Sequence, residues 1–448
     1  MGMMASAVRA RVRRRTGPAT GSSADAGGPD ARRPGGGAGA GVSPRLRGGA
    51  AQMGPFRLQR IVLLEVAAAL LLVGWVVGPL ALVPAAVVAA GLVLLAAGRR
   101  HGRSLPELWC ARRGLRARSR YAATRPAPPG TDPAFAPALE CDPSLRTYTH
   151  RGRDRREVGM VGDGTFLTVV LQVEADGAAV RFERGRQFLP LGLVRDALEV
   201  DGIRLESAQV VLHTQPAPAL HLPQQSVAVS NYAPLQARTG APSVRITWVA
   251  LKLDPALCPE AVAARGGGLA GAQKCAVRVA DQLASRLRGT GFRATVLSEE
   301  ELAAALATSA CANPLVTAQS GRAEPPERRT EETVRAWRCD NRRHTTYWVR
   351  RWPRLADTGA PALTRLVALL TAVPTLATTF SLTLRPGQGR EVSLCGHVRV
   401  TGRGDTELAA ARSALEQGSR QAGVGLLRLD REQLPGMLAT LPLGGARS

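Results

Sequence analysis

The chain has 448 residues and a formal net charge of +24, with 59 Lys and Arg residues against 35 Asp and Glu residues. This length allows two or three domains and a large buried core. Lys is found only at Lys252 and Lys274, while Ala, Gly and Pro are abundant, so the Arg content fits a GC-rich coding sequence and is weak evidence for phosphate binding. The seven cysteines form no CxxC pair, which argues against a disulfide framework or a zinc site.

Residues 1–55 consist mainly of Arg, Gly, Ala and Pro. A segment with so few large apolar side chains cannot offset the entropy of ordering, so we predict a disordered basic N-terminal tail. The Arg residues between positions 9 and 15 could contact anionic lipid. The preferred interpretation is a solvated tail without that role, or a gene start placed too far upstream, since Met53 would open the next segment well.

The most distinctive stretch is the apolar run within residues 56–100. Its 38 residues from 61 to 98 carry a single charge, Glu65. One straight helix of that length would extend about 57 Å, whereas the hydrocarbon core of a bilayer is about 30 Å thick. A single transmembrane span is therefore a poor fit.

Gly78-Pro79 and Pro84 interrupt the middle of this run. Because Pro removes a backbone donor and clashes with the preceding turn, we predict a transmembrane hairpin of two helices, about 61–77 and 80–98. A secretory signal peptide is the alternative, but its apolar region would be only about 7–15 residues long and would end at a small-residue cleavage site. The hairpin is the better interpretation.

Arginines flank the apolar run on both sides: Arg57 and Arg60 precede it, and Arg99 and Arg100 follow it. Cytoplasmic loops carry the excess of Arg and Lys in membrane proteins. We therefore predict a multi-pass protein of the plasma membrane with both termini in the cytoplasm.

Three residues of the hairpin are candidates for helix packing in the membrane. Gly74 and Gly78 form a GxxxG pattern, which lets helix backbones approach closely in lipid, although chance is an alternative in a chain so rich in Gly. Glu65 is a charged residue within the membrane segment, which marks a functional site by default. At its depth, one turn inside the cytoplasmic end, a carboxylate that reaches the interface is the simpler explanation.

The remaining chain divides by composition. Residues 101–150 are rich in Pro and Arg and are predicted to form a basic juxtamembrane helix over 104–120, followed by a linker over 121–150. Two cytoplasmic α/β units follow, at 151–320 and 321–448.

Strands and helices are predicted from apolar periodicity and turn residues. They are a strand hairpin from 158 to 173, a helix at 190–199, strands at 203–213 and 244–253 around a polar loop at 214–241, helix 267–288, strand 292–297, helix 299–307, a strand hairpin at 337–352 that turns at Asp340-Asn341, helix 362–372, strands 376–385 and 391–401, and helix 405–421.

One pattern occurs twice. Residues 291–306 align without gaps on residues 423–438, and each copy is preceded by a strand and a long helix. Both copies place an N-cap residue three positions before Glu or Gln, which is the capping-box spacing: Ser298 with Glu301, and Asp430 with Gln433. The predicted fold is an α+β (α/β-like) cytoplasmic region with two related β-α-β-α units, preceded by the two-helix transmembrane hairpin.

Residues 337–352 alternate aromatic and Arg side chains. Such a pattern could stack on and neutralise nucleic acid, or lie at a lipid interface. The simpler interpretation is a strand with one packed and one solvated face.

A search for catalytic motifs finds none. Gly266–Gly271 satisfies GxGxxG but does not directly follow a strand, so a flexible helix junction is the better interpretation. Arg403-Gly404-Asp405 is predicted to be a turn before a helix. The sequence lacks GxxxxGK[ST], HExxH and GxSxG, and the isolated histidines are predicted to be structural.

The order of several short segments is similar to that of one family. These segments are 161–170 (Val-Gly-Asp-Gly-Thr-Phe-Leu-Thr-Val-Val), 189–193 (Leu-Pro-Leu-Gly-Leu), 203–211, 247–255, 288–292 (Arg-Gly-Thr-Gly-Phe) and 346–349 (Thr-Tyr-Trp-Val). After a basic N-terminus and a two-helix hairpin, this order resembles EccE, a membrane component of actinobacterial type VII (ESX) secretion systems. The resemblance covers residues 56–445.

The resemblance implies a non-enzymatic structural subunit that works beside EccB, EccC and EccD in a plasma-membrane complex. It implies EccC as the motor ATPase, and no catalytic residue, cofactor or metal in this chain. Anchoring by the hairpin and lateral packing of the α/β region would be its mechanism, with membrane lipid as a further partner and no specific nucleic acid. A membrane-anchored transferase-like enzyme with an unrecognised active site is the alternative, and a nucleic-acid-binding membrane protein is a third possibility.

Overall fold

The structure is a computed structural model of the chain. It describes residues 54–97, 99–100, 103–124, 130–152, 155–175, 188–216, 223, 225–239, 242, 244–320, 328–353, 360–387 and 391–445. The predicted disordered tail lies outside the described residues, except for its last two positions.

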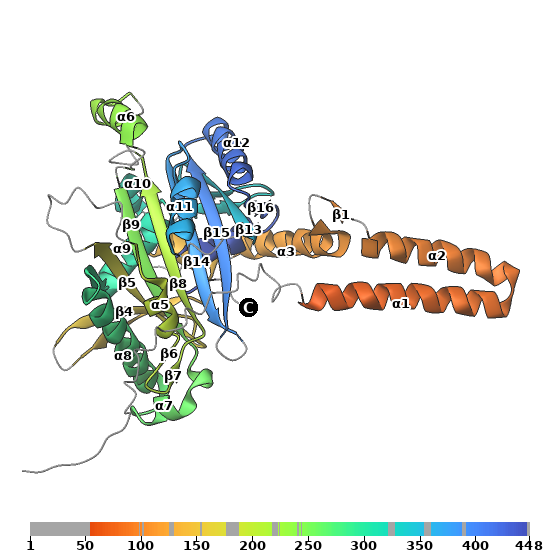
Figure 1. The fold of residues 1–448 in the computed structure, drawn as a ribbon, viewed down its shortest axis with the longest axis horizontal. Helices are drawn as coiled ribbons and strands as arrows, with labels where there is room; N and C mark the ends of the chain where they lie inside the picture. Colours follow the sequence, from red (N-terminus) through yellow and green to blue (C-terminus); the bar gives the residue numbers. More distant parts are fainter. Residues whose placement is uncertain are drawn as a thin grey trace, which may run out of the picture. The chain divides into compact units, whose positions relative to one another are not determined.

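Two apolar helices open the described chain, as the sequence predicts (Figure 1). Helix α1 (Gly54–Val77) and helix α2 (Pro79–Ala97) contact each other along a hairpin. Gly78 joins them with a φ of +123°, a conformation that residues with a side chain rarely adopt. Pro84 lies inside α2, as the predicted bounds of the second helix place it, and the change of direction is complete at Gly78.

The next segment is more structured than its composition indicates. Two short strands, β1 (Arg99–Arg100) and β2 (Arg103–Ser104), lead to helix α3 (Leu105–Thr124), which is the predicted basic juxtamembrane helix. The predicted linker contains helix α4 (Ala136–Cys141) and strand β3 (Arg146–Arg151). Pro suggested a linker here, but Pro is tolerated in the first turn of a helix, and the residues of α4 are buried.

One twelve-stranded sheet organises the rest of the described chain. Its strands are β3, β4 (Glu157–Gly162), β5 (Leu167–Ala175), β8 (Ser207–Gln215), β9 (Val244–Leu253), β10 (Phe292–Val296), β11 (Thr330–Glu332), β12 (Trp337–Cys339), β13 (Arg342–Arg351), β14 (Ala377–Pro386), β15 (Val392–Gly402) and β16 (Gly425–Arg428). The strand order is β11-β12-β13-β15-β14-β8-β9-β5-β4-β3, with β10 beside β5 and β16 beside β13. The strand pairs of this sheet are antiparallel.

Helices cover both faces of this sheet. The helices of this part of the described chain are α5 (Leu191–Asp196), α6 (Val227–Thr239), α7 (Pro259–Ala263), α8 (Gly268–Arg288), α9 (Glu299–Ser309), α10 (Pro314–Ser320), α11 (Ala360–Thr371), α12 (Asp405–Gln421) and α13 (Gln433–Thr440). Helices α5, α8, α11 and α12 contribute to one apolar core, and α4, α9 and α13 contribute to the other. The predicted polar loop at 214–241 instead contains α6, and a further small sheet pairs β6 (Glu199–Val200) with β7 (Ile203–Arg204).

The described sheet has the same strand order when it is followed outward from the β14–β8 pair in either direction. One half runs β8-β9-β5-β4-β3, and the other runs β14-β15-β13-β12-β11. Strands β9 and β10 both pair with β5, and strands β15 and β16 both pair with β13. In each predicted β-α-β-α unit, the two strands do not pair with each other. They pair on either side of an earlier strand, β5 or β13, which the prediction did not include in the unit.

Only one of the two predicted capping boxes forms. The Ser298 side chain accepts a hydrogen bond from the Glu301 N–H, and the Glu301 carboxylate accepts one from the Ser298 N–H at 2.8 Å. The box predicted at Asp430 is wrong, because Arg431 has a φ of 65° and α13 begins two residues later. Asp430 instead forms an ion pair with Arg428 at 2.6 Å.

The capping box at Ser298 predicts the effect of removing its side chain. Ser298→Ala should lower the free energy of unfolding by about 1 kcal/mol, since the Glu301 N–H in the first turn of α9 loses the Ser298 hydroxyl as its acceptor. Ser285→Ala, at an exposed position of helix α8, is the control and should change it by less than about 0.5 kcal/mol. Urea unfolding in detergent would measure both variants, and equal values would contradict the assigned cap.

Candidate membrane anchor and juxtamembrane junction

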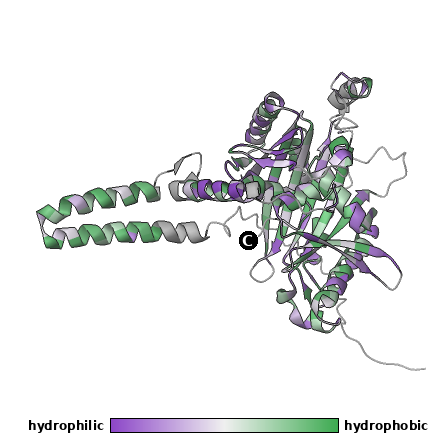
Figure 2. Ribbon diagram, turned by 180° about the vertical axis from the view of Figure 1, so that it is seen from behind, coloured by the Kyte–Doolittle hydropathy of each residue, from purple (hydrophilic) through white to green (hydrophobic). Residues whose placement is uncertain are grey.

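The described part of the α1–α2 hairpin from residue 61 on is mostly hydrophobic (Figure 2). Its large apolar side chains are mostly exposed in the isolated chain. Leu80 is 94% exposed, Val76 77% and Trp75 73%. Helix α2 is long and apolar enough to cross a membrane over Pro79–Ala96, by length and composition alone, and the apolar part of α1, Ile61–Val77, is shorter. So much exposed apolar surface requires a cover of lipid or protein.

The structure places the three candidate hairpin residues in different environments. Gly74 is buried against α2, where an added Cβ would lie 2.8 Å from the Cβ of Ala85. Gly78 occupies the turn and is not helical, so the two glycines do not form a helical GxxxG face. Glu65 is exposed on α1. Of the three residues, only Gly74 packs one helix of the hairpin on the other.

Helix α3 is attached to the α/β region by the Arg118 side chain. Its guanidinium donates to both carboxylate oxygens of Glu332, at 2.7 and 3.0 Å, and to the backbone oxygen of Arg431 at 2.7 Å. The Glu332 side chain is only 4% exposed and that of Arg118 is 28% exposed. The ion pair therefore joins α3 to the edge strand β11 in a largely dry environment.

Glu332 also completes the start of helix α13. Its carboxylate accepts a hydrogen bond from the Leu434 N–H at 3.0 Å. This satisfies one of the N–H groups that a helix leaves free in its first turn, and a carboxylate is favoured there by the helix dipole. One side chain thus holds α3, the sheet edge and α13 together.

A second set of contacts lies beside this pair. Arg328 donates to the backbone oxygen of Ala122, near the end of α3, at 3.3 Å and to that of Glu140 at 3.1 Å. The Glu140 carboxylate accepts from the N–H of Arg329 at 3.0 Å and from the Thr330 hydroxyl at 2.7 Å. We call the contacts of Arg118, Glu332, Arg328 and Glu140 the junction.

A buried ion pair between Arg329 and Asp340 lies next to the junction. Arg329 donates twice to Asp340, at 2.8 Å for each bond, and both side chains are at most 5% exposed. Asp340 lies in the predicted hairpin turn, with a φ of 52°. Sequence reasoning found the turn but missed the pairing, because it assigned no helix or strand to the Arg residues at 328 and 329. No short-range signal links them to Asp340.

The aromatic and Arg segment at 337–352 is buried on both faces of β13. Trp337 and Tyr347 are each 1% exposed, and Trp348 is 8% exposed. The expected strand with one solvated face is therefore wrong for β13, since helices cover both faces of the sheet here, whereas the short strand β12 alternates buried and exposed residues as expected. These rings are not available to stack on bases or to enter a lipid interface.

A buried polar layer lies on one face of the sheet centre. Arg399 is fully buried and donates to the Thr379 hydroxyl at 3.1 Å and to the backbone oxygen of Ser309. The Nδ1 atom of His213 lies 2.9 Å from the same Thr379 oxygen. Burial, together with repulsion from Arg399, lowers the pKa of His213 to about 3 and that of His344 well below its usual value. As predicted, these histidines are structural, and they are neutral at physiological pH.

The glycine-rich GxGxxG segment joins two helices, as predicted. Gly266, Gly267 and Gly268 all have positive φ values between α7 and α8. Gly271 lies so close to α7 that an added Cβ would be 2.4 Å from the Val262 backbone oxygen. This segment is a tight helix junction and does not follow a strand. Among the described residues, no group of three or more His, Cys, Asp and Glu could hold a metal ion.

A family comparison connects this geometry to known proteins. Residues 241–349 match the family model described as "Putative type VII ESX secretion system translocon, EccE". This match supports the predicted resemblance of the chain to EccE. No curated protein matches the chain.

The EccE match spans 109 residues (241 to 349) of the 448, from the start of β9 almost to the end of β13. It includes the junction residues Arg328 and Glu332 and the buried pair of Arg329 and Asp340. Three of the segments that suggested the EccE family from sequence lie inside it, namely those at 247–255, 288–292 and 346–349.

The junction predicts a measurable coupling between two side chains. Arg118→Met should lower the free energy of unfolding by about 1–3 kcal/mol, because the Glu332 carboxylate would be left buried without its cation. In a double-mutant cycle with Glu332→Gln, a coupling energy above about 1 kcal/mol is expected.

The matched control for this cycle is the Arg151–Glu157 pair, whose side chains are 77% and 47% exposed. Exposed pairs of this kind contribute about 0.5 kcal/mol or less. Urea unfolding would measure both cycles, and equal coupling energies would contradict the buried junction.

The neutral buried His213 predicts sensitivity to acid. Between pH 6.5 and about 3 the unfolded chain binds a proton on this imidazole and the folded chain does not, so the free energy of unfolding falls as the pH falls. His213→Gln should remove about 2 kcal/mol of the loss between pH 7 and pH 5. Urea unfolding at both pH values tests this, and an equal loss in the variant would refute it.

Proposed function

We propose that the protein is a non-enzymatic structural subunit of an actinobacterial plasma-membrane type VII (ESX) secretion complex. The observation that carries this proposal is the match of residues 241–349 to the EccE family, whose description is that of a translocon. The exposed apolar hairpin supports the anchoring part of the proposal, since its surface needs a cover of lipid or protein.

The two helices would cross the bilayer as a hairpin with both termini in the cytoplasm. Helix α1 continues past its apolar part to a total of 24 residues, and α2 has 19. Lengths of about 20 residues match the thickness of a hydrocarbon core. The Arg residues on both flanks favour the cytoplasmic side. Gly74 would hold the two helices in close contact.

The cytoplasmic region would be an internal duplication whose two copies correspond to 151–320 and 321–448. The mirrored strand order about the β14–β8 pair supports this, as does the repeated order of strands and helices in the chain. We propose that this rigid region packs laterally on neighbouring core subunits, namely EccB, EccC and EccD, and contributes no cofactor or metal chemistry of its own.

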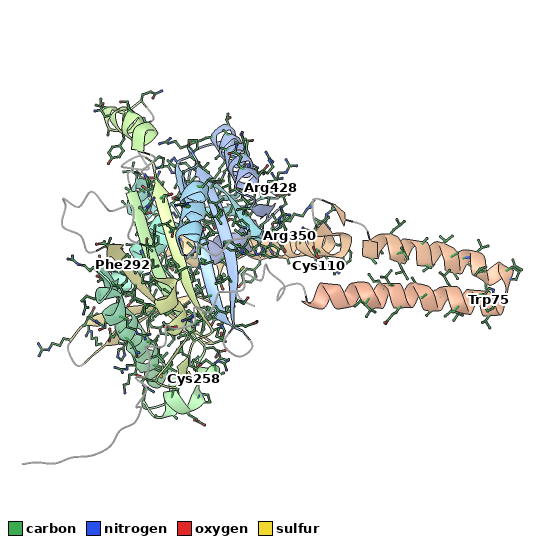
Figure 3. All side chains as sticks on the ribbon, in the orientation of Figure 1. Trp75, Cys110, Cys258, Phe292, Arg350 and Arg428 are labelled. Carbon is green, nitrogen blue, oxygen red and sulfur yellow. The ribbon has the colours of Figure 1, made fainter. Side chains whose placement is uncertain are left out.

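Topology can be tested through Cys110, which is exposed on helix α3 (Figure 3). In intact cells, a membrane-impermeant maleimide should leave Cys110 unlabelled until the cells are permeabilised. Leu80→Cys, at the turn of the hairpin, is the positive control and should be labelled from outside. Labelling of Cys110 in intact cells would rule out the proposed orientation.

Assembly can be tested at the contact between the two helices. Gly74→Leu should separate α1 from α2 and reduce co-purification with membrane partners at least several-fold, since even an added Cβ is too close to Ala85. Gly91→Leu adds the same bulk to α2 where no atom lies within 4 Å of an added Cβ, and it should leave recovery unchanged. Full recovery of the Gly74→Leu complex would show that this contact does not support assembly.

A further inference from the structure

Helix α3 has two opposite faces. Trp109, Arg112, Arg113 and Arg116 are separated by three, four and seven positions, so at 100° per residue they share one face of the helix. All four are exposed. Arg118, which holds the junction, lies about 180° from Trp109 on the same wheel. The junction therefore directs the other four side chains away from the α/β region.

These four side chains form one continuous surface, which we call the basic face. They line a shallow surface hollow of about 390 Å³. The Arg113 guanidinium lies over the Trp109 ring at 4.7 Å from its centre, in a cation–π contact. The indole, which is 61% exposed, thus holds one arginine in place beside the other two.

The basic face lies close to the proposed membrane segment. Seven residues, 98 to 104, separate the end of α2 from the start of α3, and a chain of that length spans at most about 25 Å. Helices α2 and α3 also contact each other. Trp109 and the arginines that follow it therefore begin within one or two helical turns of the first residue of α3.

We propose that the basic face binds the phosphate of an acidic phospholipid headgroup at the cytoplasmic surface of the membrane. This inference rests on the proposed membrane anchoring of the hairpin. Arg presents a planar set of N–H donors that matches the oxygens of a phosphate. Trp is enriched at the membrane interface, where its ring contacts the acyl boundary and its N–H reaches polar groups.

The observations favour lipid over other anionic partners. Clusters of arginines directly beside a transmembrane helix are typical of binding to anionic lipid. The basic face is a single stripe on one helix that holds one aromatic ring, whereas a nucleic-acid strand would need a longer track of stacking side chains. An acidic surface on a protein partner would give no preference between lipid headgroups, so the experiment separates the two.

The experiment uses energy transfer at Cys110, the neighbour of Trp109 in the sequence. Of the seven cysteines, Cys110 is exposed, Cys395 is half-buried and the other five are buried, so the Cys395→Ser protein can be labelled at Cys110 alone. The full-length protein carries a donor dye at this position in mixed-lipid vesicles. The acceptor dye is placed on the tail of either phosphatidylglycerol or phosphatidylcholine, at the same low fraction.

Local enrichment of phosphatidylglycerol over phosphatidylcholine on the order of fivefold is expected for a held phosphate. Replacing Arg112, Arg113 and Arg116 together by Gln should abolish the preference. Replacing Arg278, Arg286 and Arg288 of α8, which are also exposed, removes the same charge and should preserve it. Because screening shortens from about 10 Å at 0.1 M salt to about 3 Å at 1 M, the preference should weaken in high salt.

Equal transfer from both lipids in the unmutated protein, with the hairpin inserted, would overturn the proposal and would leave an acidic protein surface as the partner. Loss of the preference in the α8 control would also overturn it, because net charge alone would then explain the effect. A protein that does not float with neutral vesicles would contradict the membrane anchoring itself, which distinguishes failure of the proposed function from failure of this inference.

Discussion

The arrangement of the described chain depends on the contact between Arg118 and Glu332. The Glu332 carboxylate binds a guanidinium from α3 and the first-turn N–H of α13 at the same time. Because this carboxylate is almost completely buried, it needs its cation, and the cation in turn fixes the rotation of α3. Without this contact, the remaining Arg328 bond to Ala122 near the end of α3 would fix the rotation of the helix less firmly.

The pairing of the strands in the sheet explains why the edge strand β11 is held in place. Strand β11 pairs with β12, which pairs with β13, and β13 is covered on both faces by helices. The buried pair of Arg329 and Asp340 ties the start of β11 to the β12–β13 turn. A short edge strand that would otherwise fray is therefore held by side chains on both sides.

Much of this architecture could be predicted from sequence. The hairpin and the long strands were predictable because their signals are local: a charge-poor run broken at Gly78, and β-branched periodicity. The Ser298 cap was predictable for the same reason. The Asp430 cap was not, because the left-handed conformation of Arg431 delays the start of α13, and no sequence spacing encodes that.

The junction was the least predictable part of the candidate site. It joins Arg118 to Glu332, which are 214 positions apart in the chain, and each belongs to a run of similar charges. Nothing in such a run distinguishes the one residue that will be buried. Strand β3 and helix α4 were also not predicted. Their apolar patterns are weak, and the Pro-rich composition of this segment indicated a linker instead.

The central claim is that α3 and the sheet edge form one rigid body. Its most direct test is a distance measurement between spin labels at Cys110 and at Glu331→Cys, an exposed position of β11, in lipid nanodiscs with Cys395→Ser. A single narrow distance distribution that broadens in the Arg118→Met variant is the predicted result. A broad distribution in the protein with Arg118 intact would contradict the account.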